Sequence, residues 1–157
     1  MKLPASLLAL QSPAVRAQLA ALPAADDYTL LRPAVGRTLV GCWARFPIRL
    51  ESEANRRDHW GPKMERTREQ RTIAAAVLSH IPDGWRPALP CVVLVTRIAP
   101  RALDDDNLVR SCKACRDQVA KWLGIDDRDR RVVWHYRQER AGIGEFGVRV
   151  ELKAGEP

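Results

Sequence analysis

The sequence predicts an α+β fold in which a small mixed β-sheet is packed by two main helices. Three stretches support this prediction: an alternating, β-rich pattern from Arg37 to Leu50, an almost continuous apolar run from Pro90 to Ile98, and a helical pattern from Asp104 to Gly124. Alternation indicates strands, and spacings of three and four residues indicate helices. With 157 residues, 46% of them hydrophobic, the chain suits one domain with a sizeable core.

Residues Met1–Val35 are predicted to form an N-terminal helical arm. They are rich in Ala, Leu and Pro and contain one short helical pattern, from Ala14 to Ala21. Such a segment either contacts a partner or another subunit, or is a loosely ordered extension. We therefore expect the domain itself to span residues 36–157.

The first predicted strand, Arg37–Leu50, carries apolar side chains on both faces. Cys42 and Phe46 fall on one face, whereas Leu39 and Trp43 fall on the other. Both faces should therefore be buried. Pro47 has no N–H to pair and should end the strand, at a sheet edge or a bulge.

A densely charged segment follows, from Glu51 to Arg71, and it is a candidate surface for a nucleic-acid backbone because its basic residues outnumber its acidic ones. His59 and Trp60 are expected in a loop, where they either contact a base or sugar or pack ordinarily. The proposed DNA-binding residues of this segment are Arg56, Arg57, Lys63 and Arg66.

The next predicted helix begins near Pro62 and continues through Leu78. Proline is favoured in a first helical turn, where its missing N–H costs nothing. Ile73, Val77 and Leu78 form an apolar stripe that would pack on the sheet.

The apolar run Pro90–Ile98 is predicted to be the central strand. It leads through a short loop to the aspartates at the start of the next helix. Cys112 and Cys115 are expected to be small buried hydrophobes rather than disulfide partners or zinc ligands. One buried helix face is predicted from intervals of four and three residues: Leu108, Cys112, Cys115, Val119 and Trp122.

Two further strands are predicted, Arg131–Arg137 and Phe146–Leu152. Gly142 and Gly144 lie between them and predict a loop that joins them as a β-hairpin. The preceding segment is again basic, and its proposed DNA-binding residues are Arg128 and Arg130.

Five aspartates lie in two groups at the two ends of the helix from Asp104 to Gly124: Asp104–Asp106 before it and Asp126–Asp127 after it. If the fold brings the groups together, their repulsion costs roughly several kcal/mol unless a divalent cation neutralises it. Carboxylate oxygens suit Mg²⁺ or Mn²⁺. A structural role is also open, because Asp104 fits a helix N-cap and the triplet would meet the positive end of the helix dipole favourably.

The charge balance favours a polyanionic partner, since 26 Lys and Arg against 19 Asp and Glu leave a formal +7. A basic surface around a carboxylate-held metal suits phosphodiester hydrolysis, yet many basic proteins only bind nucleic acid. No apolar stretch is long enough to span a bilayer, and the N-terminal segment lacks the apolar core of a secretory signal. We expect a cytoplasmic protein with no membrane partner and no small-molecule cofactor.

Two short sequences carry a family resemblance. Asp104–Leu108, DDDNL, resembles the DxDNL motif of RusA-type Holliday-junction resolvases, and Gly124–Asp127, GIDD, resembles the paired aspartates that follow the same helix in that family. The resemblance is specific over about Pro90–Leu152. It implies a homodimeric, magnesium-dependent endonuclease for four-way or other branched DNA, with Mn²⁺ as an alternative ion, and a metal site formed by Asp104, Asp106 and Asp127.

The chain departs from the family pattern at one catalytic position. The family has a lysine four residues after the second motif aspartate, where this chain has Arg110. Lys113 lies on the same predicted helix stripe as Asp106. Because a guanidinium gives up its proton poorly, we expect Lys113 to take the catalytic role and Arg110 to contact DNA.

Two hypotheses from other classes stay open. The chain could be a non-catalytic binder of branched or single-stranded nucleic acid that keeps the resolvase fold. Alternatively, it could be an interaction protein that recruits partners through the Met1–Val35 arm.

Overall fold

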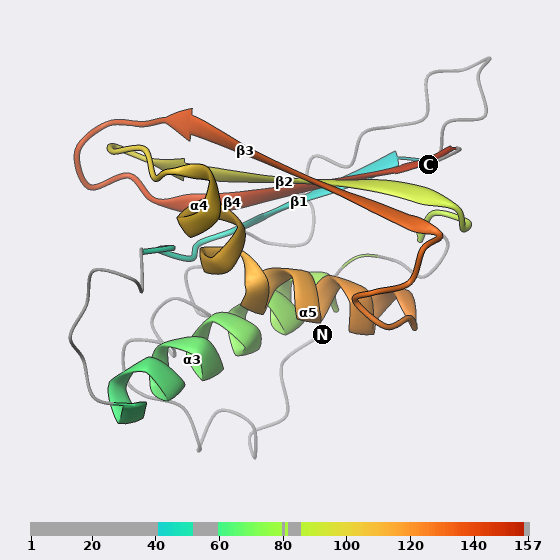
Figure 1. Cartoon of the computed structure of the whole chain (residues 1–157), viewed down its shortest axis with the longest axis horizontal. Coiled ribbons are helices and arrows are strands. Elements are labelled where there is room, and N and C mark those ends of the chain that lie inside the picture. The colour runs from blue at the N-terminus through green and yellow to red at the C-terminus, as the bar shows by residue number, and fades with distance from the viewer. Residues whose placement is uncertain (1–40, 52–59, 80, 82–85, 156–157) are drawn as a thin grey trace.

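The computed structural model describes residues 41–51, 60–79, 81 and 86–155, and this part of the chain has an α+β fold (Figure 1). Its helices lie together on one face of a β-sheet (Figure 1). The predicted arm and the first residues of the first predicted strand lie outside the described residues. The strands are β1 (Gly41–Phe46), β2 (Cys91–Ala99), β3 (Val132–Arg140) and β4 (Gly147–Ala154), and the helices are α3 (Trp60–Leu78), α4 (Asp105–Ser111) and α5 (Lys113–Leu123).

The four described strands form one mixed sheet in the order β1-β4-β2-β3. β2 pairs in parallel with β3 and antiparallel with β4, so that Val95 lies opposite both Tyr136 and Val150. The prediction that β2 is a central strand is therefore confirmed. β1 pairs antiparallel with β4 and ends at Phe46, directly before Pro47, as the missing N–H predicts.

The predicted β-hairpin between the last two strands is wrong. β2 lies between β3 and β4, so these two consecutive strands are not paired with each other. The α4–α5 crossover returns the chain parallel to β2, as helical crossovers do, and the loop around Gly142 and Gly144 then carries it to the other side of β2. Alternating residues identified the strands but contained no information about their pairing partners.

The helix α3 begins at Trp60, which is therefore helical and not part of the preceding loop as predicted. Pro62 lies in its first turn, in agreement with the sequence pattern. The stripe of Ile73, Val77 and Leu78 is buried, which confirms the predicted packing face. His59 lies outside the described residues.

The core fills the space between the helices and the sheet. Val93 and Val95 of β2 and Val150 of β4 are fully buried. Trp134 and Tyr136 of β3 are half-buried and pack against this core.

The single helix predicted between the two aspartate groups is divided into α4 and α5 at Cys112. The backbone at Cys112 stays near the helical region, with φ −80° and ψ −6°, and its N–H still donates to the carbonyl of Leu108. The buried face therefore continues across the division through Cys115 and Val119, as predicted, and Trp122 packs beside it half-buried. Cys112 and Cys115 are free thiols, and burial raises the pKa of Cys112 to about 11.

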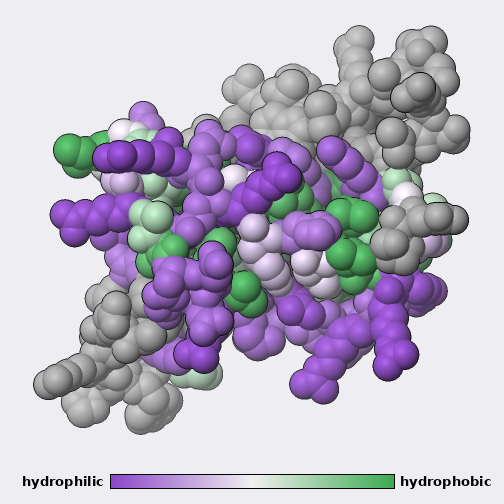
Figure 2. All heavy atoms as spheres, turned by 45° about the horizontal axis from the view of Figure 1, so that its top comes forward, coloured by the Kyte–Doolittle hydropathy of each residue, from purple (hydrophilic) through white to green (hydrophobic). Residues whose placement is uncertain are grey.

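The surface of the described residues is mostly hydrophilic on the face in Figure 2, where hydrophobic side chains form only small patches. None of the described helices has the length and apolarity needed to cross a bilayer.

Candidate functional site

The first aspartate group lies where β2 leads into α4. Asp104 is the N-cap of α4: its Oδ1 accepts from the backbone N–H of Asn107 at 2.9 Å, and its Oδ2 accepts from the Asn107 side-chain amide at 2.7 Å. These two hydrogen bonds lower the pKa of Asp104, the backbone bond most strongly. Asp105 and Asp106 follow, exposed, in the first turn of α4. The predicted cap is thus confirmed, and it involves one of the three carboxylates.

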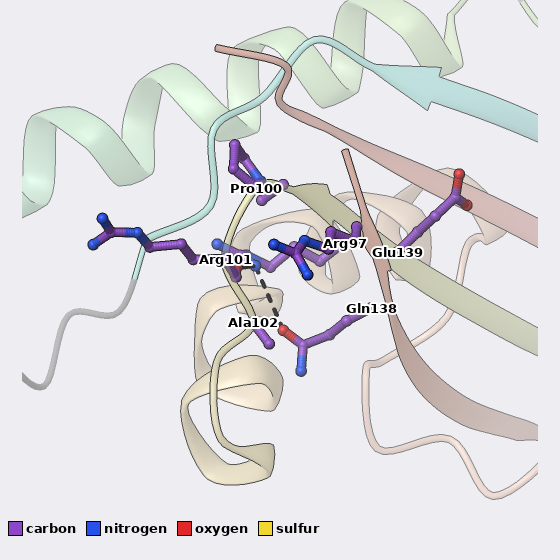
Figure 3. A pocket seen from close by; sticks show the side chains of 8 residues that line it. Arg97, Pro100, Arg101, Ala102, Gln138 and Glu139 are labelled. Atoms are coloured by element: carbon purple, nitrogen blue, oxygen red, sulfur yellow. Dashed lines mark hydrogen bonds between the residues drawn. The ribbon is translucent and has the colours of Figure 1, made fainter. Parts of the chain in front are cut away.

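A side chain from β3 fixes the loop that carries Asp104. Gln138 donates from Nε2 to the carbonyl of Leu103 and accepts at Oε1 from the Leu103 N–H, both at 2.7 Å. Arg97 of β2 donates from Nη1 to the carbonyl of Arg101 at 2.7 Å and lies 3.5 Å from Gln138 Oε1 (Figure 3). The residue directly before Asp104 is therefore held to the sheet by two hydrogen bonds.

The second aspartate group lies where α5 turns back toward β3. Gly124 ends α5 in the left-handed region, at φ +75°, which glycine adopts without strain and which confirms it as the predicted C-cap. Asp126 accepts at Oδ1 from the N–H of Arg128 at 2.9 Å and so closes the next turn. This turn leads the chain back alongside α5.

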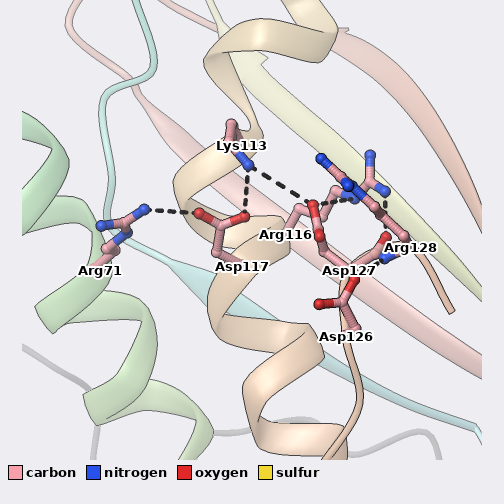
Figure 4. A network of polar contacts seen from close by, with 7 residues as sticks. All are labelled: Arg71, Lys113, Arg116, Asp117, Asp126, Asp127 and Arg128. Atoms are coloured by element: carbon pink, nitrogen blue, oxygen red, sulfur yellow. Dashed lines mark hydrogen bonds and ion pairs between the residues drawn. The ribbon is translucent and has the colours of Figure 1, made fainter.

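Asp127 lies against two cations of α5 (Figure 4). Its Oδ2 is 3.7 Å from Lys113 Nζ and 3.7 Å from Arg116 Nε. The Arg116 guanidinium also donates to the backbone carbonyl of Asp127. Residues at opposite ends of the α5 segment are thereby brought together. The sequence identified Lys113 and Asp127 as site residues but did not predict this contact.

Lys113 also belongs to a second ion pair. Its Nζ is 3.1 Å from Oδ1 of Asp117, one turn later, and Oδ2 of Asp117 is 2.7 Å from Arg71 Nη2 of α3 (Figure 4). Lys113 therefore connects Asp117 with Asp127, and Arg71 ties this network to α3. These pairs are partly exposed, so each contributes less than about 1 kcal/mol to folding.

Asp106 lies apart from this network. It is exposed in the first turn of α4 and makes no hydrogen bond or ion pair with another described residue. Seven residues separate it in sequence from Lys113, which corresponds to roughly 10 Å along a helix axis. The division between α4 and α5 at Cys112 lies between the two residues, so the shared helix stripe predicted for them is not established, and their side chains make no contact.

The carboxylates fit a hard divalent cation in their chemistry. An ionised carboxylate offers about four lone-pair positions, and Asp104 uses two of them for Asn107. The 3.7 Å contacts of Asp127 are longer than hydrogen bonds and leave its oxygens available. Among the described residues, however, no three His, Cys, Asp or Glu side chains are grouped as metal ligands. The convergence of Asp104, Asp106 and Asp127 on one ion stays a prediction.

The predicted DNA-binding residues are distributed over three parts of the fold. Lys63 is exposed and Arg66 half-buried on α3, and Arg110 is exposed on α4. Arg128 and Arg130 are exposed between α5 and β3, beside Asp127 in the chain. Arg56 and Arg57 lie outside the described residues.

Sequence reasoning missed several residues that hold the site together. Arg116 is the main partner of Asp127, and its guanidinium lies 5.2 Å from the ring of Trp134 on β3. Its position three residues after Lys113 could have indicated the same helix face. No sequence signal could have identified Arg97 or Gln138, because each donates to a backbone carbonyl that is far away in sequence, that of Leu50 for Arg97 and that of Leu103 for Gln138.

Comparisons of this chain with protein-family models, curated proteins and solved structures found no match. The resemblance to RusA-type resolvases therefore rests on the DDDNL and GIDD sequences themselves.

Proposed function

We propose that this protein is a magnesium-dependent endonuclease that cuts four-way or other branched DNA. The observation that carries the proposal is the return of the chain after Gly124, which brings Asp127 against Lys113 on the helix pair that begins with DDDNL. Asp127, a candidate metal ligand, and Lys113, a candidate phosphate-binding cation, thus lie side by side. The preceding helix, α4, begins with three further carboxylates.

The residues have separate roles in this proposal. Asp104, Asp106 and Asp127 would hold the ion, which when bound would stabilise negative charge on the phosphate and lower the pKa of a water molecule. Lys113, which is exposed, neutralises charge on the phosphate or its leaving oxygen. Asn107 and Gln138 keep the Asp104 carboxylate and its loop in place.

The DNA backbone would be bound by the basic side chains around the acidic groups. Symmetric cleavage of a four-way junction needs two sites related by a two-fold axis, so the proposal includes a homodimer. The DNA-contacting residues proposed are Arg56, Arg57, Lys63, Arg66, Arg110, Arg128 and Arg130.

The test is cleavage of a synthetic four-way junction, a flap and a linear duplex, with and without Mg²⁺. Asp106→Asn and Asp127→Asn should each abolish magnesium-dependent cleavage and leave junction binding intact or stronger, since each removes a negative charge. Asp126→Asn is the matched control, because Asp126 holds only its own turn. Cleavage at the wild-type rate by the Asp106 or Asp127 variant would contradict the proposal.

A second candidate is a non-catalytic binder of branched or single-stranded nucleic acid. The pairing of Asp127 with Lys113 and Arg116 favours it, because a purely structural aspartate would have such partners. This candidate predicts salt-sensitive binding that needs no metal, and no nicking of any of the three substrates.

A further inference from the structure

Arg97 is a buried cation without a carboxylate partner among the described residues. It is only 5% exposed, and it donates to the carbonyls of Leu50 and Arg101 and to the side-chain oxygen of Gln138. Burial lowers its pKa. Glu51, the carboxylate that acts on it electrostatically, forms its ion pair with Arg49 at 2.7 Å instead. A buried charge is costly unless it is compensated, so this guanidinium is suited to an anion.

The guanidinium borders a hollow of about 410 Å³ at the ends of β2 and β3 (Figure 3). Its Nη2 makes no hydrogen bond with a described residue, whereas Nε and Nη1 are both used. Arg101 and Arg140 also line the hollow, are exposed, and form no ion pair with described residues. The one carboxylate in the lining, Glu139, is 3.0 Å from Arg149. Arg97, Arg101 and Arg140 therefore all line this hollow, and its acidic residue is already paired.

A second hollow, of about 550 Å³, adjoins the first and shares Arg97, Pro100 and Arg101 with it. Ile143, which is fully exposed, and Phe146 contribute its apolar surface. An anion held at Arg97 would thus have an apolar surface beside it. This combination suits a phosphate that carries a sugar and a base better than a free inorganic ion.

We propose that the hollow lined by Arg97, Arg101 and Arg140 is a subsite for a backbone phosphate of the nucleic acid. The subsite deepens the proposed function and rests on it for the identity of the ligand. Gln138 lines the same hollow and holds Leu103, so a phosphate bound here lies next to the loop that leads to Asp104. The subsite would position one strand relative to the acidic residues of α4.

The first experiment measures binding of a fluorescent four-way junction in EDTA, so that cleavage does not interfere, over a range of salt concentrations. The double variant Arg101→Ala with Arg140→Ala should bind about tenfold or more weakly, and its salt slope should be smaller by about two. Arg97 stays unchanged because it also holds the loop. The control is Arg137→Ala, an exposed arginine of β3 that does not line the hollow, which should change binding less than about twofold.

Equal losses in the double variant and the control, or no loss in the double variant, would overturn the subsite and leave the proposed function standing. If the wild type binds no junction at all, the proposed function fails and a second measurement decides the subsite. Inorganic phosphate and a thymidine dinucleotide are then titrated into ¹⁵N-labelled protein. Shifts confined to the Arg97 and Gln138 side chains and the amides of residues 101–103, larger with the dinucleotide, support the subsite, whereas no shifts there overturn it.

Discussion

The two aspartate groups are held in opposite ways. At the β2–α4 junction, Asp104 accepts hydrogen bonds from the uncharged Asn107, and the neutral Gln138 fixes the loop before it. After α5, Asp127 lies against the cations Lys113 and Arg116. The first group is positioned without loss of its negative charge, whereas the second is partly neutralised.

This difference indicates what metal binding would require of each side. A cation at the first group meets a carboxylate already oriented and ionised, so little reorganisation is needed. A cation shared with Asp127 would be repelled by the charges of Lys113 and Arg116, which lie 3.7 Å from Oδ2 of Asp127. Lys113 would then be released toward the phosphate, which gives one side chain two successive partners.

The largest effect is expected for Lys113, which pairs with Asp127 and is also proposed to neutralise charge on the phosphate. Lys113→Ala should lower magnesium-dependent junction cleavage by about 100-fold or more, as loss of a charge-stabilising group does in other enzymes. Arg110→Ala should lower junction cleavage less than about tenfold, since Arg110 is expected to contact only the DNA backbone. Single-turnover cleavage rates measure both, and equal, near-wild-type rates would remove Lys113 from the mechanism.

The loop before Asp104 is held by Gln138, and a substitution of Gln138 tests this contact. Gln138→Leu removes two hydrogen bonds to Leu103 and leaves its N–H and C=O without those partners, so the free energy of unfolding should fall by about 2 to 3 kcal/mol. Gln118→Leu on α5 is the control, because the side chain of Gln118 makes no hydrogen bond with a described residue, and it should change stability by less than about 0.5 kcal/mol. Urea unfolding provides the values. A loss no larger than that of the control would show that the loop does not depend on this contact.

The ion pairs that link Arg71, Asp117, Lys113 and Asp127 should contribute little to the free energy of unfolding. Arg71→Ala breaks the 2.7 Å pair with Asp117 and should cost less than about 1 kcal/mol, because the arginine is 46% exposed. The difference should shrink further in 1 M NaCl, where such pairs are screened. A salt-independent loss above about 2 kcal/mol would mean that Arg71 acts mainly through packing.

The smallest effect is the pH dependence of the Asp104 cap. Because the pKa of Asp104 is lowered in the folded protein, its stabilising contribution is complete above the unfolded pKa, about 3.9, and is lost as the pH falls through the folded value. The stability difference between wild type and Asp104→Ala should therefore shrink as the pH falls below about 5. Asp104→Ser keeps an uncharged cap, so its difference from Asp104→Ala should stay constant. A wild-type difference that is also constant would contradict the assigned shift.

The elements of the fold could be predicted because each depends on local spacing. Pro62 and Gly124 marked helix ends, and Ile73 and Val119 fell on buried faces, since both signals act within a few residues. The pairing of β3 could not be predicted in this way. Gly142 and Gly144 indicate a turn whether or not the flanking strands are neighbours, and the position of β2 between them depends on the whole sheet.

In the candidate site, too, the local features could be predicted from the sequence and the long-range contacts could not. The N-cap role of Asp104 follows from its place before a helix, and it is observed. Two other contacts could not be predicted: Asp127 pairs with Arg116, and Gln138 hydrogen-bonds to Leu103. Each contact joins two segments whose relative position is determined only by tertiary packing. Long-range contacts to backbone groups leave no pattern in a single sequence.

The central claim is that Asp104, Asp106 and Asp127 share a divalent cation. Electron paramagnetic resonance of free Mn²⁺ during titration with the folded protein, alone and with junction DNA, counts bound ions directly. We predict at least one tightly bound ion per chain in the presence of DNA, lost in both Asp106→Asn and Asp127→Asn and retained in Asp126→Asn. Absence of binding by the wild type, or equal binding by all four proteins, would contradict the claim.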